Sequence, residues 1–466
     1  MQDFREWSAQ WIRAHEEEIL SDLISFCRIR SVSRADLAKS GAPFGEECRA
    51  MLDFALAHAR KMGFQTEDHQ GYCGSAILGD GENAIGILSH IDVVPEGENW
   101  HTPPFDPVRK GEFLFGRGVA DNKCAAVMGL YLMRMFREGN FSLRHGLRVL
   151  FGCSEETGMQ DLSYYARHCT PPVVSLIPDS KFPTNYAQKG AMSGTMHIGL
   201  GEQIAEFSGG EVPNMVPPGA RALLRGIRAD DLRLPEGFAV CERDGTAEVS
   251  CRGVAAHAAR PEKGISAIHL LSKALCECGV LRGQSLEAMR AVREVTSDYY
   301  GANMNIALED PDTGKTTMVV GRARTEQGEL VLSLDCRLSI AANLQQTMEN
   351  FVRAARCLGL ETMDMATTPP VFISREDARV RATQEAYREE TGDDAPAYTT
   401  GGGTYARVMP NALTFGLSFP GEPPRPTGLP ASHGGAHAPD EFLHIPSFFR
   451  AMKIYALAIP KLDRIV

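Results

Sequence analysis

The first 180 residues alternate between apolar runs and segments with helical spacing. Trp7, Trp11, Leu20 and Ile24 recur at helical intervals, which predicts an amphipathic helix near the N-terminus. Further along, short apolar runs bounded by turn residues predict strands, and a longer periodic segment predicts a second helix. The predicted strands are 75–80, 84–94, 147–156 and 173–180, and the predicted helix is 125–140. Strands that alternate with helices indicate an α/β layer with a mostly parallel sheet covered by helices.

This pattern changes after about residue 183 and resumes near residue 382. Between these points, alternating strands interrupted by two helices are typical of an α+β unit. Its predicted strands are 195–202, 246–260 and 330–339, and its helices are 265–279 and 344–359. The later segments are a helix at 379–392, a glycine-rich turn at 401–403, a strand at 411–419 and a helix at 442–459. We therefore predict a discontinuous α/β domain at 1–184 and 382–466, with an inserted α+β domain at 185–381.

Composition narrows the class of protein. With 466 residues, 43% of them hydrophobic and 23% charged, the chain is an ordinary globular protein of two or three domains. Its net charge of −11 argues against a nucleic-acid partner, because phosphate binding needs a basic face. No apolar run approaches the eighteen residues of a membrane span, and we expect a cytoplasmic protein. Twelve scattered cysteines are interpreted as reduced core residues.

Acidic and imidazole side chains gather where the predicted strands end. In open α/β sheets, ligands bind beyond the carboxyl ends of the strands. The candidate residues at this edge are His90, Asp92, Asp121, Glu155, Glu156, Asp179 and His437. Each one alone is better explained as a helix cap, a turn residue or a surface residue. Their joint occurrence at strand ends instead favours a common site.

A cluster of carboxylates would repel itself unless cations compensate the charge. Mixed nitrogen and oxygen ligands suit zinc, manganese or cobalt, and a carboxylate can bridge two ions that activate a shared water. Glu155 and Glu156 are neighbours at a strand end and point apart. One of them can bind metal while the other remains free as a general base.

Five motifs carry a resemblance to a known family. They are SHIDVVPEG, GRGVADNKC, CSEETGMQD, PDS and GAHAPDE, and in order and spacing they resemble the metal-site motifs of the M20 co-catalytic metallopeptidases. Within that family the chain is most similar to the PepV-type dipeptidases (Xaa-His dipeptidase or carnosinase-like). The segments GGEVPNMVPPGA and VAAHAARPEKGISAIHLL support this similarity, which covers nearly the whole chain.

The resemblance implies two divalent metal ions per chain, with Asp121 bridging them. The other ligands would be His90 and Asp179 for one ion, and Glu156 and His437 for the other. The outer domain would then be the catalytic metal-binding domain, and the inserted domain a lid that binds substrate.

The resemblance also implies roles for residues that do not bind metal. Glu155 would be the general base on the bridging water, and Asp92 would orient His90. From the inserted domain, Asn214, His257 and Arg337 would hold the substrate and its developing oxyanion. The implied activity is hydrolysis of unblocked dipeptides by a monomer.

Two alternatives stay open. An N-acyl amino acid deacylase, of desuccinylase or deacetylase type, would use the same metal site, although the long insertion favours a dipeptidase. A binding protein that lost the chemistry is disfavoured because every ligand and the base are present. The loop after Asp121 departs from the usual family pattern at Asn122 and Cys124, which could alter the start of the following helix.

Overall fold

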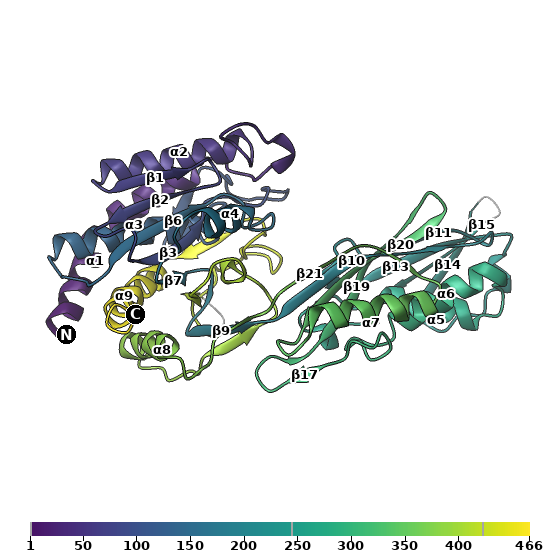
Figure 1. Ribbon diagram of the computed structural model, residues 1–466. Coiled ribbons are helices and arrows are strands. Elements are labelled where there is room, and N and C mark those ends of the chain that lie inside the picture. Colours follow the sequence, from purple (N-terminus) through teal and green to yellow (C-terminus); the bar gives the residue numbers. More distant parts are fainter. Residues whose placement is uncertain (1, 244–245, 422–423) are drawn as a thin grey trace. The chain divides into compact units, whose positions relative to one another are not determined.

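The computed structural model describes residues 2–243, 246–421 and 424–466 (Figure 1). The chain divides into two compact units. The first contains residues through Tyr186, Ile373–Tyr398 and Gly403–Val466, and the second contains Ala187–Phe372 and Thr399–Gly402. The first unit resumes at Ile373, nine residues before the predicted return at residue 382. A boundary at residue 382 would cut helix α8 (Ala378–Thr391), which begins at Ala378 because the side chain of Asp377 caps it.

The larger sheet, most of which belongs to the first unit, has the strand order β1-β2-β6-β3-β7-β24-β9-β22, with β23 beside β9. The strands are β1 (Gln65–His69), β2 (Cys73–Leu78), β3 (Ala84–His90), β6 (Gly146–Gly152), β7 (Val174–Ile177), β9 (Thr184–Gln188), β22 (Val371–Phe372), β23 (Tyr398–Thr400) and β24 (Ala412–Phe415). The α/β class is confirmed. Parallel pairing, however, joins the central strands β6-β3-β7-β24, while the pairs β1-β2, β2-β6, β24-β9 and β9-β22 are antiparallel.

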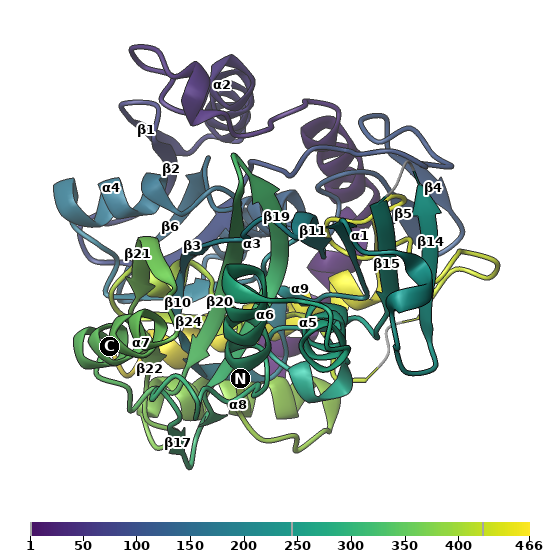
Figure 2. The same cartoon turned by 90° about the vertical axis from the view of Figure 1, so that its right-hand side faces the viewer.

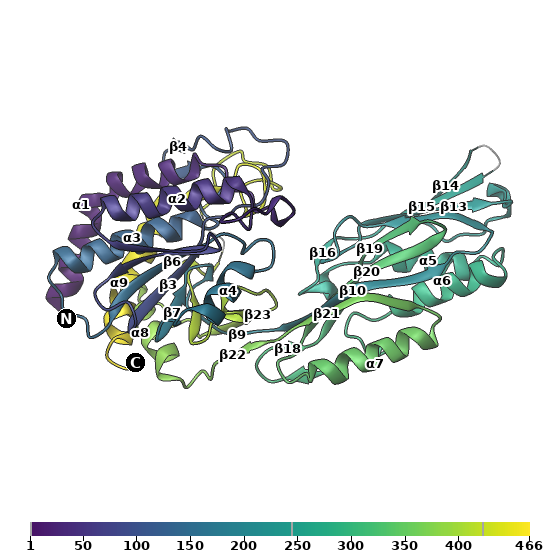
Figure 3. The ribbon, with the colours of Figure 1, turned by 45° about the horizontal axis from the view of Figure 1, so that its top comes forward.

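Helices cover both faces of this sheet (Figures 1 and 3). On one face, α3 (Lys123–Glu138) packs against β3 and β6 and contacts α1 (Gln2–Cys27) and α9 (Ile445–Leu462), while α2 (Glu46–Lys61) lies on β1 and β2. On the other face, α4 (Gln160–His168) and the short η4 (Tyr405–Arg407) enclose a separate apolar cluster. Strands β3 and β6 are therefore buried along their whole length, as their mostly apolar sequences indicate.

Two small sheets complete the first unit. Strands β4 (Val108–Lys110), β5 (Phe113–Phe115) and β26 (Phe442–His444) form one, and β8 (Ser180–Lys181) pairs with β25 (Leu417–Ser418) in the other. Both join a segment of the first 181 residues to a segment of the last 50. The C-terminal segment is thereby anchored beside the ends of the central strands.

The second unit is an antiparallel sheet with three helices on one side (Figure 2). Its order is β14-β15-β13-β11-β19-β20-β10-β21. The strands are β10 (Gly190–Gly199), β11 (Ile204–Gly209), β13 (Gly219–Arg225), β14 (Phe238–Arg243), β15 (Thr246–Arg252), β19 (Thr317–Glu326), β20 (Glu329–Leu338) and β21 (Glu361–Thr368). The helices are α5 (Ala267–Glu277), α6 (Gly283–Val295) and α7 (Leu344–Cys357), and two short sheets pair β12 (Met215–Val216) with β16 (Ala256–His257) and β17 (Glu309–Asp310) with β18 (Gly314–Lys315).

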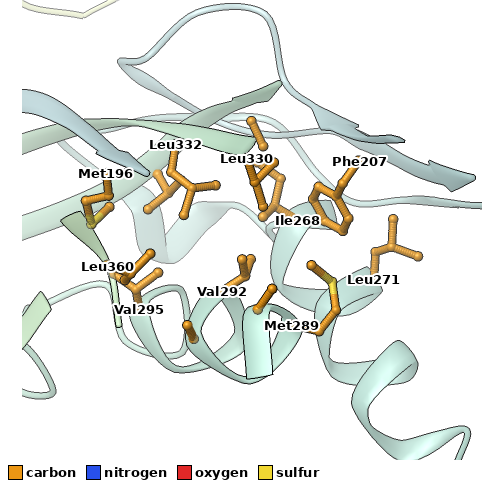
Figure 4. Close-up of a cluster of buried hydrophobic side chains, with 14 of the residues drawn as sticks. Met196, Phe207, Ile268, Leu271, Met289, Val292, Val295, Leu330, Leu332 and Leu360 are labelled. Atoms are coloured by element: carbon orange, nitrogen blue, oxygen red, sulfur yellow. The ribbon is translucent and has the colours of Figure 1, made fainter. Parts of the chain in front are cut away.

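A single apolar core holds these helices to the sheet. Figure 4 shows Met289 and Val292 of α6 facing Leu330 and Leu332 of β20. Helix α6 was not predicted from the sequence. Several of its buried positions are the small residues Ser285, Ala288 and Ala291, so its apolar stripe is weak.

The second unit begins and ends on neighbouring strands. β10 carries the chain in and pairs with β21, which carries it out, with Ala191 opposite Thr368. Since this pairing brings the two ends together, the unit has the geometry of an insertion into a surface connection. Across the described ranges of both units, the helices are too short or too polar to span a bilayer.

Candidate metal centre

The central parallel strands place the candidate residues of the first unit at one edge of the sheet. β3 lies between β6 and β7 and runs parallel to both, so the carboxyl ends of the three strands are neighbours. His90 ends β3, Glu155 and Glu156 follow β6, and Asp179 follows β7. The loop after β5 adds Asp121, and the loop before β26 adds His437.

Asp121 lies between two histidines from opposite ends of the chain. Its Oδ1 is 3.1 Å from His90 Nε2, and its Oδ2 is 3.2 Å from His437 Nε2. His437 Nε2 is also 3.0 Å from Oε1 of Glu156. One carboxylate therefore presents a separate oxygen to each of two ligand groups. Two other groupings have ligand atoms within 4.8 Å of one another: His90 with Asp121 and Glu156, and His90 with Glu155 and Asp179.

The spacing and the donor set fit divalent metal ions. Ligand atoms about 2.1 Å from a common ion lie about 3.0–3.5 Å apart, which matches the separations around Asp121. Nitrogen donors from two histidines and oxygen donors from carboxylates are the mixture that zinc, manganese and cobalt accept. The residues present thus fit a centre of two ions that share Asp121.

The electrostatics of the cluster also favour bound cations. Burial and the nearby charge of Asp179 raise the pKa of Glu155 well above its ordinary value. Burial and the charge of Asp121 likewise raise the pKa of Asp179 to about 7. Burial opposes ionisation of Asp121 too, but hydrogen bonds from His437 and His90 outweigh it and lower the pKa of that carboxyl. Cations at this edge would relieve the repulsion between the carboxylates.

Asp92 joins the loop after β6 to β3. Its Oδ1 accepts the Glu155 N–H and its Oδ2 accepts the Glu156 N–H, both at 3.2 Å. The Nδ1 of His90 lies 3.0 Å from the backbone oxygen of Asp92 and 3.5 Å from its carboxylate. Asp92 therefore contacts His90 mainly through the main chain, while its carboxylate positions both glutamates.

Glu441 holds the Asp121 loop, and the sequence did not reveal it. One of its oxygens accepts the N–H groups of Ala120 and Asp121, at 2.9 and 3.0 Å. The other oxygen accepts Gly118 N–H at 3.1 Å and a 2.7 Å bond from Arg117, and both ionic side chains of this pair are buried. Because these contacts join residues more than 300 positions apart, no local sequence pattern predicts them.

Asp161 holds the Glu155–Glu156 loop in a similar way. Its Oδ2 accepts the N–H groups of Cys153 and Ser154, at 2.6 and 2.8 Å, and the hydroxyl of Tyr405 at 2.5 Å. The side chain is completely buried. It fixes the end of β6 directly before the two glutamates, and sequence reasoning missed it as well.

The two departures from the family pattern leave the helix start intact. α3 begins at Lys123, next to Asn122, and Cys124 is buried with its thiol 3.3 Å from the oxygen of Ala120. The amide of Asn122 donates a 2.7 Å hydrogen bond to the oxygen of Pro178. It thereby connects the loop of Asp121 to the loop of Asp179.

A third cluster, of His101, His433 and Asp440, has a different geometry. The Nδ1 atoms of the two histidines lie 2.7 and 2.8 Å from the same oxygen of Asp440, which are hydrogen-bond distances. The other oxygen accepts both the N–H and the hydroxyl of Thr102. Asp440 is therefore fully hydrogen-bonded, and it ties the segment that carries His437 to the segment after Trp100.

The second unit brings together the three residues predicted to bind substrate. Met215, next to Asn214, pairs with His257 across β12 and β16, and the backbone oxygen of Asn214 accepts the Ala258 N–H at 2.9 Å. Burial and the charge of Arg337 lower the pKa of His257. Asn214 and His257 are exposed, and Arg337 is partly buried.

Arg337 is already engaged on one edge of its guanidinium. Its Nε and Nη2 donate to the two oxygens of Asp335, at 2.8 and 2.9 Å, and Nη1 donates to the oxygen of Gly401 at 3.0 Å. A guanidinium carries five N–H bonds. One remains on each of Nη1 and Nη2, so only the end of the group is left for a carboxylate.

Comparisons with known proteins agree with this centre. The family model "Peptidase family M20/M25/M40" matches residues 86–461. A Bacillus subtilis (strain 168) protein named "Putative dipeptidase YtjP" is 29% identical over 481 residues, covering 98% of this chain and all of the relative.

Two solved structures share the fold. Human carnosine dipeptidase 1 matches with a TM-score of 0.61 at 13% identity, over 99% of both chains. The YXEP protein of Bacillus subtilis, described as a dinuclear metal binding peptidase from the M20 family, matches with a TM-score of 0.53 at 9% identity. It covers 97% of this chain and all of its own.

Proposed function

Because the chain belongs to peptidase family M20/M25/M40, we propose that it is a metal-dependent dipeptidase that cleaves unblocked dipeptides. The observation that carries the proposal is the position of Asp121, with one carboxylate oxygen beside His90 and the other beside His437. The relative from Bacillus subtilis, similar along its whole length and named "Putative dipeptidase YtjP", supports the substrate class.

We assign His90 and Asp179 to one ion and Glu156 and His437 to the other, with Asp121 shared. Two divalent ions bound there would polarise the scissile carbonyl and lower the pKa of a water molecule. Zinc, manganese and cobalt all suit these ligands.

Glu155 is the proposed general base. It belongs to the loop that Asp92 and Asp161 position, and it lies beside His90 and Asp179. It can therefore take the proton of the attacking water and deliver it to the leaving amine.

The second unit would hold two groups of the substrate, its terminal carboxylate and the oxyanion that develops at the scissile carbonyl. The free end of the Arg337 guanidinium suits the carboxylate of a dipeptide, and Asn214 and His257 suit the developing oxyanion. A dipeptide places its carboxylate one residue beyond the scissile bond, whereas a longer peptide places an amide there. Preference for dipeptides follows from this arrangement.

The test is a substrate panel assayed after metal removal and after reconstitution. We expect chelated protein to be inactive, and zinc, manganese or cobalt to restore cleavage of dipeptides such as Ala-Ala. Tripeptides and N-acyl amino acids should react at least ~100-fold more slowly, because they lack the free amine or the correctly placed carboxylate. Faster turnover of N-acetyl or N-succinyl amino acids would identify a deacylase instead. The monomeric state and the cytoplasmic location expected from the sequence stay predictions.

A further inference from the structure

A cavity of about 770 Å³ opens beside the metal-centre candidates within the first unit. Asp121 and Asp179 line one part of it. Its volume lies in the range typical of small-molecule sites. A substrate held at those carboxylates would therefore have an adjacent space for one of its substituents.

The walls of the cavity are largely apolar. Phe419 and Leu417 come from β25 and the residue that follows it, Phe442 from β26 and Phe448 from α9. The aromatic side chains are packed rather than loose: Phe419 lies 5.0 Å from Phe182, measured between ring centroids, and Phe442 lies 5.3 Å from Phe113. Pre-ordered aromatic walls bind apolar groups without a large entropic cost.

The charges on the lining are unevenly distributed. Its two carboxylates, Asp121 and Asp179, are the ones we assign to metal. Its cations are Lys181 and Arg450, both exposed, and within the described ranges neither forms an ion pair. With metal bound, the lining residues that the structure describes would present cations but no uncommitted carboxylate. A cationic substituent would therefore be repelled.

From these observations we infer that the cavity binds the side chain on the N-terminal side of the scissile bond, and selects bulky apolar side chains over small or cationic ones. The inference rests on the proposed dipeptidase function. The carbonyl under attack belongs to that N-terminal residue, so its side chain starts nearest the metal-binding carboxylates. The residue on the other side carries the carboxylate that we assign to Arg337 in the second unit.

The experiment compares kcat/KM for X-Ala dipeptides with X as Gly, Ala, Leu, Phe or Lys, and for the mirrored Ala-X series. We expect Leu-Ala and Phe-Ala to exceed Gly-Ala by ~10-fold or more, the discrimination usual for an apolar pocket. Lys-Ala should fall below Leu-Ala, and the Ala-X series should vary less than the X-Ala series.

Two variants connect this pattern to the cavity. Phe419→Ala should lower kcat/KM for Phe-Ala more than for Ala-Ala, and Phe141→Ala, an aromatic change in a separate cluster with Phe4, is the matched control. Lys181→Gln should raise the ratio of Lys-Ala to Leu-Ala by about threefold, because one repulsive charge near the site is removed. Lys61→Gln, an exposed lysine of α2, should leave that ratio unchanged.

The outcomes distinguish failure of the inferred specificity pocket from failure of the proposed dipeptidase function. If dipeptides are cleaved but the X-Ala series is flat, or if Lys181→Gln leaves the ratio unaltered, the cavity is not the specificity pocket and the dipeptidase proposal stands. If no dipeptide is cleaved, both proposals fall. If Phe419→Ala fails to fold, Lys181→Gln, a substitution of an exposed side chain, still tests whether the cavity binds the substrate side chain.

Discussion

Glu155 and Glu156 are adjacent in the chain, and the backbone N–H of each donates to the carboxylate of Asp92. Their own carboxyl groups, however, have different neighbours. Glu156 Oε1 lies 3.0 Å from His437 Nε2, and we propose both side chains as ligands of the same metal ion. Glu155 instead has a raised pKa because of burial and the charge of Asp179. Adjacent residues after a strand point apart, so one pair can serve two purposes.

The two glutamates should therefore give different phenotypes. Glu155→Gln removes a proton acceptor but no assigned ligand, so metal content should stay at two ions per chain while kcat falls at least ~100-fold. Glu156→Gln should lower metal content and recover activity at high metal concentration. Metal analysis and steady-state kinetics check both. Reversed phenotypes would exchange the two assignments.

Glu441, the last residue of the GAHAPDE motif, should contribute strongly to stability although it is not among the assigned metal ligands. Glu441→Gln leaves the buried Arg117 without its ion-pair partner and should destabilise the metal-free protein by about 3–5 kcal/mol. The matched control is Asp106→Asn, which breaks an exposed pair with Arg28 and should cost less than ~1 kcal/mol. Denaturant unfolding measures both. Equal losses would mean that the buried pair holds no more structure than the surface pair.

At this scale, sequence reasoning could find the residues that we propose as metal ligands, but not the residues that hydrogen-bond to their loops. His90 and Asp179 follow apolar runs, so their place at a strand end can be read locally. Asp161 and Glu441 act on backbone N–H groups of other segments. Their burial is invisible in the sequence because an isolated Asp or Glu is usually exposed.

Helix α8, which begins the return to the first unit, depends on its cap. Asp377 accepts the Arg379 N–H at 2.8 Å and also pairs with its guanidinium. Asp377→Ala should lower the free energy of unfolding by about 1 kcal/mol, whereas Glu376→Ala, one residue earlier, should have little effect. Thermal or denaturant unfolding distinguishes them.

The same cap predicts a pH dependence. The hydrogen bond from Arg379 lowers the pKa of Asp377, so the carboxylate contributes stability at neutral pH. That contribution is lost as the pH falls below about 4, where the side chain is protonated. The difference between wild type and Asp377→Ala should shrink over that range. If the difference in unfolding free energy between the two proteins stayed constant over this pH range, the charge of Asp377 would not contribute to the stability of helix α8.

Predicted elements succeeded where the hydrophobic pattern was strong. The buried strands β3, β6 and β7 appear in the sequence as mostly apolar runs, each with one or two polar residues, and the structure has strands at those positions. Helix α6 was missed because small residues fill much of its buried face. The prediction of a mostly parallel sheet was only half right, because strand direction depends on how distant segments of the chain pair.

At the scale of the whole molecule, the chain carries both groups of candidate residues, one in each unit. If a single chain completes its own site, mixing inactive His257→Ala with inactive Glu155→Ala protein should restore no activity. Activity should be assayed over a range of protein concentrations. Recovery that rises with concentration would show that a neighbouring chain supplies His257, and the predicted monomer would then be wrong.

The pairing of β10 with β21 has a consequence for synthesis. Translation proceeds at roughly 5–20 residues per second, and domains fold as units while they emerge from the ribosome. The strands of the second unit's sheet, up to β21, are all made before β24 and the segment of His437 exist. β7, in contrast, can pair with β3 at once, but its second parallel neighbour, β24, comes from the far side of the insertion. The part of the enzyme that comes second in the sequence can therefore be the first to finish folding, while the acidic residues of the nascent first unit still lack the histidine that completes their cluster.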